Sequence, residues 1–423
     1  MPRFQEPLFP RSNQYQPRLH SDNALDYYLV AARSIQGSGD PAHQPPKPGD
    51  VRWIQQNERA FRILQQGVSK PYRWVIEYRV GDPPFPDFAA LRNLARLVAG
   101  RIRLAIATKD GMDAVRDWRV GVHMAWDIQG DMMLNYLVGV AMEAMVHAPI
   151  VSEMDFFSSA ECRAMADTLI RMERSPDRFP SAIEGERAFA LRWLDEMLPP
   201  GKPEILLEVV RTDWNMDPQT GKPTEPEEPA EDEEEEKLRA EERRQYERLR
   251  PQMLAIAQSP TAYEELRASL RREINRWAEE SLRVLRLPYG RQLQALREPA
   301  SREDTPFSYF AELLRPMRSP LLSGYLTNRA RRRLMLVHLM LRVYRLQYGN
   351  YPDTLHTLKL EELIIDPFSG RELVYKREGE RYRLYSVGQD GKDDGGHRPQ
   401  PGEHPVEGDA IPRDLFLTRD GWR

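Results

Sequence analysis

An acidic, glycine-rich stretch near the C-terminal end of the chain could bind a metal ion. GQDGKDDGG at 388–396 is followed by EGDA at 407–410, so carboxylates and backbone carbonyls alternate on segments that glycine keeps flexible. Calcium takes about six to eight hard oxygen ligands of this kind. The same composition is also typical of a solvated turn without a metal, and the residues alone leave both interpretations open.

Other reactive side chains do not form recognisable motifs. His397 and His404 lie between the two acidic runs, but the surrounding prolines and the lack of a second ligand pair argue against a transition metal. Cys162 is the only cysteine, which excludes an intrachain disulfide and a cysteine-based zinc site. No nucleophile elbow, P-loop, Rossmann glycine pattern or zinc motif is present. The sequence therefore offers no catalytic residue.

The elements before the acidic stretch indicate how it would be positioned. A long helix is predicted from its apolar stripe, and Gly349 with Pro352 should end it. Asp366-Pro367 and Ser369-Gly370 mark a turn. Two strands, at 371–377 and 381–387, flank Glu378-Gly379, which is a hairpin signal because glycine tolerates positive φ. The stripe consists of Leu334, Val337, Leu341, Tyr344 and Tyr348.

These pieces, in this order, resemble the C-terminal part of the major pseudopilin of type II secretion systems. In that family a helix ending in a YrlxxGrYP-like pattern leads to a DPwG-like turn, a tyrosine-containing strand, a YSlGaDG-like strand and loop, and a terminal aDI-like segment. The matching segments here are 344–352, 366–370 and 385–391, together with Asp409 and Ile411. The resemblance covers roughly the last fifth of the chain.

The resemblance implies a calcium site in the loop that follows the last strand. Asp390 corresponds to the family's loop aspartate, Asp409 to the distal aspartate, and the backbone carbonyl of Val387 to a ligand carbonyl. Asp393 and Asp394 are further candidates in the same loop. The insertion HRPQPGEHPVE between the two acidic runs departs from the tighter loop of the family.

The start of this module also departs from a pseudopilin, which begins with an apolar helix that assembles the filament. Here SPLLSGYLTNRARRR at 319–333 precedes the matching helix, and its arginines are incompatible with a segment buried in lipid. The whole layout is similar to uncharacterised bacterial membrane-anchored helical proteins with a YSVGxDGKDDGG-like ending, a similarity that begins at 21–32. It implies a location on the extracytoplasmic side of the cell envelope, with membrane contact only through an anchor outside this sequence.

Composition and charge limit the partners. The chain has 423 residues and a net charge of −4, so no overall field favours nucleic acid or a membrane surface. Arginine alternates with glutamate along helical stretches, which predicts solvated helix faces and argues against nucleic-acid binding. The first 25 residues contain no apolar run long enough for a signal peptide. We therefore expect a protein partner.

The fold class that follows is mainly α: an antiparallel helical array, bundle- or solenoid-like, with a small C-terminal α+β pseudopilin-like hairpin module. One helix is predicted over 51–66, and another starts with Thr261 as its N-cap and Glu264 three residues later. The apolar run at 137–144 is too short for a membrane span.

The chain divides into five expected parts. An acidic, proline-rich segment cannot bury apolar area and is predicted to be a linker between two helical regions. The parts are an irregular N-terminal segment (1–20), a helical domain (21–212), the linker (213–237), a helical continuation (238–332) and the pseudopilin-like helix, hairpin and acidic loop (333–423).

Two classes of function fit these observations. The first is a non-enzymatic interaction or scaffold protein of the cell envelope or related to secretion, with a C-terminal module ordered by calcium. The alternative is an enzyme with an unrecognised active site in the helical domain.

Overall fold

The structure is a computed structural model that describes residues 15–37, 39, 42–76, 87–208, 233–295, 305–314, 318–396 and 414–417. Over these ranges the protein is mainly helical and carries one small two-stranded antiparallel sheet, which confirms the predicted class at that level. The segment 1–20 and the linker lie largely outside the described ranges; the residues from Glu233 on already belong to a helix.

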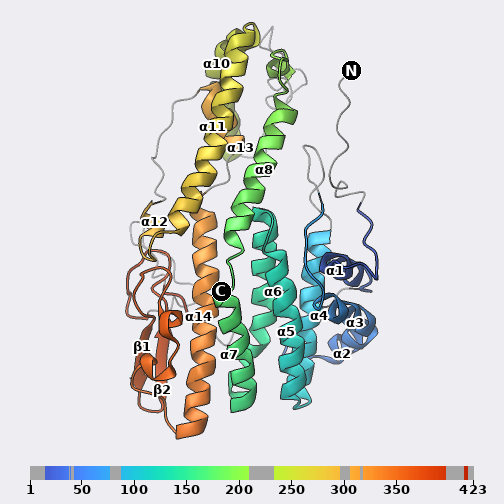
Figure 1. The fold of residues 1–423 in the computed structure, drawn as a ribbon, viewed down its shortest axis with the longest axis vertical. Helices are drawn as coiled ribbons and strands as arrows, with labels where there is room; N and C mark the ends of the chain where they lie inside the picture. Colours follow the sequence, from blue (N-terminus) through green and yellow to red (C-terminus); the bar gives the residue numbers. More distant parts are fainter. Residues whose placement is uncertain are drawn as a thin grey trace.

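The N-terminal elements form most of a helical body. Helices α4, α5 and α6 pack against one another, α7 lies beside α5, and α1 to α3 cover the α4 side (Figure 1). The elements are α1 (Ala24–Arg33), α2 (Pro48–Gln56), α3 (Glu58–Gly67), α4 (Asp87–Ala107), α5 (Gly111–Ile128), α6 (Met133–Ser152), the 3₁₀ helix η1 (Met154–Phe156) and α7 (Ser159–Arg174).

The later elements complete the body and form two additions to it. Helix α14 packs along α7, so it belongs to the body despite its late position in the chain. The elements are α8 (Phe179–Met197), α10 (Glu233–Ala257), α11 (Pro260–Leu285), α12 (Gln292–Ala295), α13 (Pro306–Leu314), α14 (Arg318–Tyr348), the 3₁₀ helices η2 (Leu355–Leu358) and η3 (Glu361–Ile364), β1 (Val374–Glu378) and β2 (Arg381–Tyr385).

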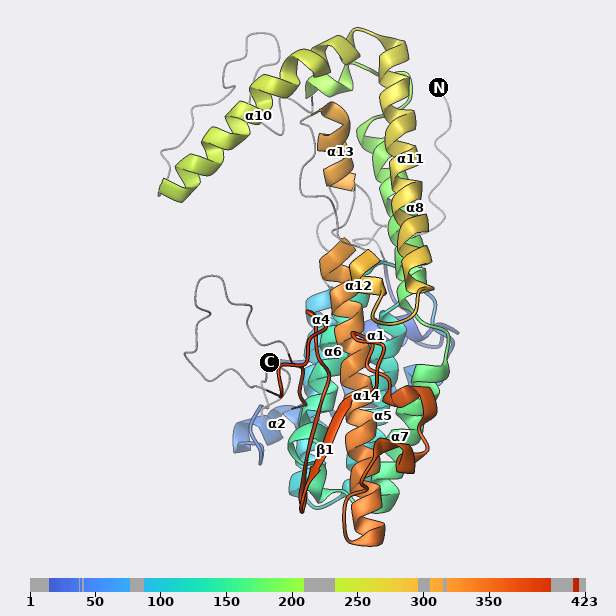
Figure 2. The same ribbon diagram turned by 90° about the vertical axis from the view of Figure 1, so that its left-hand side faces the viewer.

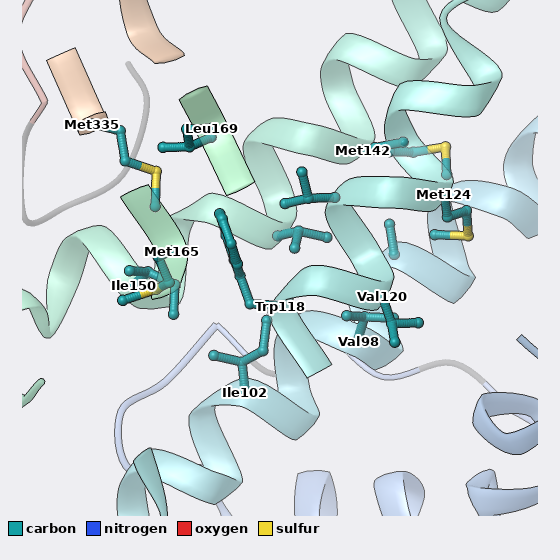
Figure 3. Packing of buried hydrophobic residues seen from close by; sticks show 14 of the residues in the cluster. Val98, Ile102, Trp118, Val120, Met124, Met142, Ile150, Met165, Leu169 and Met335 are labelled. Carbon is teal, nitrogen blue, oxygen red and sulfur yellow. The ribbon is translucent and has the colours of Figure 1, made fainter. Parts of the chain in front are cut away.

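A single apolar core joins the body helices. Trp118 of α5 lies between side chains of the neighbouring helices, among them Ile150 of α6, Met165 of α7 and Met335 of α14 (Figure 3). All four side chains are buried. The apolar residues of α4 are buried here as well, because they recur at helical spacing on one face. Met165 and Met335 are thus core residues.

Two helix predictions need correction. The helix predicted over 51–66 is broken at Asn57, whose amide nitrogen donates to the carbonyls of Trp53 and Gln36 while its oxygen accepts the Gln36 N–H. Side-chain bonds of this kind compete with the helical ladder. The cap of α11 is Ser259 rather than Thr261: its hydroxyl accepts the N–H of Ala262, and Pro260 occupies the first turn.

Helix α6 extends well beyond the apolar run at 137–144 that is predicted to be too short for a membrane span. It spans 20 residues and is the one helix of the described ranges that is long and apolar enough to cross a membrane. In the structure 61% of that span is buried, and α6 packs against α4, α5 and α8. The prediction that the run is too short was therefore wrong about its length.

Helices α8, α10, α11 and α13 form an arm that leaves the body. Figures 1 and 2 show α8 and α11 side by side along this arm, with α10 at its far end. The arm has its own apolar core, made by Leu194 of α8, Leu270 and Ile274 of α11, and Phe310 of α13. Because this core is separate from that of the body, the arm is a second packing unit.

The C-terminal module comprises residues 349–396 and 414–417 and packs on α14. Gly349, with φ +80°, follows the end of α14 as predicted. Strands β1 and β2 pair with Glu378 opposite Arg381, and Gly379 at the turn has φ +65°, as the hairpin signal required. Helix α14 begins at Arg318 and runs unbroken through the expected boundary at 332/333.

Candidate functional site

Asp366 connects the two motif segments that carry the family resemblance. It is fully buried, and one carboxylate oxygen accepts the Phe368 N–H (3.0 Å) and the Ser386 hydroxyl (2.8 Å). The other oxygen accepts the Val387 N–H at 2.9 Å. Burial raises the pKa of the Asp366 carboxyl, and these hydrogen bonds oppose the rise. The turn after η3 and the end of β2 are thereby held together.

The acidic loop after β2 is organised by its own carboxylates. Asp390 accepts the N–H of Lys392 at 3.1 Å. Asp393 accepts the Tyr385 hydroxyl at 2.7 Å and the Gly395 N–H at 2.9 Å. These are the hydrogen bonds of Asx-type turns, as expected for the solvated-turn interpretation.

Asp414, which sequence reasoning missed, closes this loop from the C-terminal side. Its carboxylate accepts the Gly396 N–H at 2.8 Å and lies 3.5 Å from the Asp394 nitrogen. The next residue, Leu415, exchanges backbone hydrogen bonds with Ser386, so the segment adds to the edge of β2. The short apolar run LFL that follows Asp414 was the available signal for an extended segment.

The predicted calcium ligands are brought together only in part. Asp390, Asp393 and Asp394 share one loop, whereas Asp409 lies outside the described residues. Val387 is buried and donates its N–H to Asp366. Among the residues that the structure describes, no three acidic, histidine or cysteine side chains form a group that could hold a metal.

A buried ion pair between α14 and α6 is the second feature that sequence reasoning missed. Arg332 Nε donates to Glu143 Oε1 at 2.5 Å, and Nη2 donates to Glu143 Oε2 at 2.6 Å. Both side chains are almost completely buried. Burial alone would raise the pKa of the Glu143 carboxyl, but the Arg332 guanidinium holds it well below its usual range. Glu143 is therefore ionised inside the core.

Polar neighbours complete the hydrogen bonding of this pair. Gln129 donates to Glu143 Oε2 and accepts from Arg332 Nη2, each at 2.6 Å. His147, four residues after Glu143, lies with Nε2 3.2 Å from Glu143 Oε1, while its Nδ1 accepts the Trp118 N–H at 3.0 Å. The Trp118 bond assigns the proton of the neutral imidazole to Nε2, which then donates to Glu143.

Two further arginines of α14, on either side of Arg332 in the sequence, pair with a buried carboxylate of α7. Arg329 and Arg333 both donate to Glu173 Oε2, at 3.0 and 3.1 Å. Arg329 also pairs with Asp177, and Arg333 donates to the Ile365 carbonyl at 2.6 Å, which reaches the C-terminal module. The prediction of solvated faces, made for arginines that alternate with glutamate, does not extend to this part of α14, which carries no glutamate and whose Arg329, Arg332 and Arg333 face buried carboxylates.

This hydrogen-bonded network connects helices inside the core, where a substrate cannot reach it. Glu143 and His147 are 0% and 2% exposed, so neither reaches solvent. A buried ion pair of good geometry specifies register, since any other pairing leaves an uncompensated charge. The signal in the sequence was the i,i+4 spacing of Glu143 and His147 in an otherwise apolar helix.

Comparison of the chain with protein-family models, with curated proteins and with solved structures gives no match in any of the three.

Proposed function

We propose that the protein is a non-enzymatic interaction or scaffold protein whose partners are proteins. The observation that carries this proposal is the arm: helices with a core of their own extend from the body (Figure 2), and α8 and α11 each keep an exposed face, for example at Arg192 and Arg272. A projecting helical unit offers surface for docking while the body keeps its own core intact.

The arm is held as a defined unit, which a docking surface requires. Arg267 of α11 donates to the Leu198 carbonyl at 2.6 Å and to Asp195 at 2.7 Å, and the Tyr263 hydroxyl donates to the Pro199 carbonyl at 2.8 Å. These bonds fix α11 against the end of α8. A preorganised surface loses less conformational entropy on binding than a mobile one.

The proposal also includes the predicted helix arrangement, the nature of the C-terminal module and the place where the protein acts. The body is an antiparallel bundle, the C-terminal module is pseudopilin-like, and the protein acts at the cell envelope or in secretion. The coupling of the DP turn to the YSVG segment through Asp366 supports the module assignment. An enzyme with its site in the helical domain is less well supported, because the titratable pair in its core is closed to solvent.

Calcium ordering of the module is also proposed, with Asp409 completing the loop ligands. Calcium should raise the melting temperature of the protein, and Asp390→Ala should abolish the rise, because the loop loses a ligand oxygen. Magnesium serves as the control cation, since it demands a smaller octahedral site. A melting temperature that calcium leaves unchanged would exclude the calcium site.

The interaction proposal is tested by capture followed by reconstitution. The tagged full chain is cross-linked in its native cells, the retained protein is identified, and the two purified proteins are titrated by calorimetry. Hydrogen exchange then maps the contact. We expect a complex of fixed stoichiometry with protection in α8 and α11. Failure of every retained protein to bind after purification would refute the proposal.

A further inference from the structure

A cleft of about 490 Å³ lies where the C-terminal module meets the lower end of the body. Six parts of the chain line it: the end of α6, η1, the C-terminal part of α14, the loop that follows α14, the hairpin and the C-terminal segment. The volume is within the range of roughly 300–1,000 Å³ that is typical of ligand pockets. The lining residues are Val151, Met154, Asp155, His338, Arg345, Tyr351, Glu380, Arg381, Tyr382 and Leu417.

The inner surface of the cleft is an ordered aromatic group. The Tyr382 hydroxyl lies 2.6 Å from His338 Nδ1, and its ring meets Tyr351 edge-on with centroids 4.6 Å apart. The Arg345 guanidinium sits 4.9 Å above the Tyr351 ring, and Nη1 donates to the Tyr351 hydroxyl at 3.0 Å. These contacts fix the rings and the guanidinium before any ligand arrives.

The charges at the mouth favour an anion. Arg381 is exposed and makes no ion pair with any carboxylate of the described residues. Glu380 is 94% exposed and lies 3.7 Å from Arg345, a distance that leaves it free to move aside. Asp155 lies 3.6 Å from Arg342, which also donates to its carbonyl. The lining therefore carries two guanidinium groups and two carboxylates, and one of these carboxylates, Asp155, already has Arg342 as a partner outside the lining.

The opposite wall is apolar, and the apolar character continues outside the cleft. Val151, Met154 and Leu417 supply the wall. Tyr348, one turn beyond Arg345 on α14, is 57% exposed. Tyrosine and arginine are the residue types that dominate binding energy at protein interfaces. This composition suits a ligand that extends beyond the cleft more than a compact small molecule.

We infer that the cleft binds a peptide segment of a partner protein in which a carboxylate side chain stands next to an apolar one. The carboxylate would pair with Arg381 and Arg345, and the apolar side chain would pack on Val151, Met154 and the ring of Tyr382. This inference rests on the proposed function and adds a second docking position, at the opposite end of the molecule from the arm tip (Figure 1).

The test uses fluorescein-labelled short peptides bound to the full chain and followed by fluorescence anisotropy. The probe is a positional-scanning peptide library with leucine fixed at one position and aspartate, asparagine or lysine fixed beside it. We expect the aspartate pool to bind about tenfold more tightly than the asparagine pool, because a charge-assisted hydrogen bond is lost in the amide. The preference should weaken as salt is raised.

Two variants locate the site. Arg381→Glu should abolish the preference for aspartate and favour the lysine pool. The matched control Arg272→Glu changes an exposed arginine of α11 in the arm and should leave the preference intact. Both variants should melt like the original protein, since both side chains are exposed. Equal binding of the aspartate and asparagine pools, or a preference that survives Arg381→Glu, would overturn the inference.

The outcome can be separated from that of the proposed function. A purified partner that binds the Arg381→Glu chain as tightly as the original would overturn the cleft assignment and leave the interaction role standing. If no partner binds at all, the proposed function itself fails.

Discussion

Replacing Arg332 by methionine would test whether the buried ion pair holds α14 against α6. The substitution removes the guanidinium and leaves Glu143 ionised and fully buried, with only Gln129, His147 and Asn328 as donors. Truncating one partner of a buried, hydrogen-bonded pair costs about 3–5 kcal/mol. We therefore expect Arg332→Met to lower the free energy of unfolding by that amount.

The measurement is equilibrium unfolding in urea at about pH 7, followed by circular dichroism. The matched control is Arg271→Met, which removes an arginine that pairs with Asp195 at 2.6 Å while both side chains remain nearly half exposed. An exposed pair is worth at most about 1 kcal/mol. A loss for Arg332→Met no larger than for Arg271→Met would refute the reasoning.

A double variant and a pH series sharpen this prediction. Glu143→Leu with Arg332→Met should cost less than the sum of the single changes, with a coupling of about 3 kcal/mol, because no unpaired charge stays buried. The folded-state pKa of Glu143 is lowered, so its contribution is present above the unfolded pKa and is lost as the pH falls below about 4.5. The difference in free energy of unfolding between the original protein and Glu143→Gln should become smaller as the pH falls through that range. Single-variant losses that simply add up in the double variant would contradict the coupling.

Two further changes act at the junction of α5, α6 and α8. Burial raises the pKa of Asp131 to about 6, so ionisation of its carboxyl lowers the stability of the folded protein above that pH. Asp131→Asn should therefore raise the free energy of unfolding by up to about 3 kcal/mol at about pH 7 and leave it unchanged near pH 3.5. Denaturant unfolding that gives the two proteins parallel curves of unfolding free energy against pH would contradict this. A Cβ on Gly185 would lie 1.4 Å from the Asp131 carbonyl oxygen, so Gly185→Ala should lower the free energy of unfolding by about 2 kcal/mol or more. The control Gly49→Ala adds a Cβ with nothing within 4 Å and should not lower it. Equal melting temperatures of the two variants would refute the packing.

The sequence predicted the elements whose signals are local. The end of α14 at Gly349 follows from turn chemistry within a few residues. The β1–β2 hairpin with positive φ at Gly379 likewise depends on neighbouring residues alone. Such signals survive folding because no distant segment has to agree with them.

The buried charges could not be predicted because their partners are far apart in the chain. Arg332 and Glu143 are separated by 189 positions, and a pattern along one helix does not show which face another helix will cover. Arginine beside glutamate in sequence indicates a solvated face. Only the packing of α14 against α6 and α7 shows that these arginines are buried.

Composition located the acidic loop, but the residues alone could not decide between a solvated turn and a calcium site. Aspartates next to glycines form hydrogen bonds to their own backbone, and the same residues can ligate calcium. Asp414 was missed because its role depends on a return of the chain to the edge of β2. The cleft beside this module was missed for the same reason, since six separate parts of the chain line it.

If this protein works by binding another protein, calorimetric titration of the purified full chain with the purified protein that it captures should show it. We expect saturable binding at a fixed stoichiometry, with hydrogen-exchange protection on α8 and α11. Heats that never exceed dilution for any captured protein would contradict it.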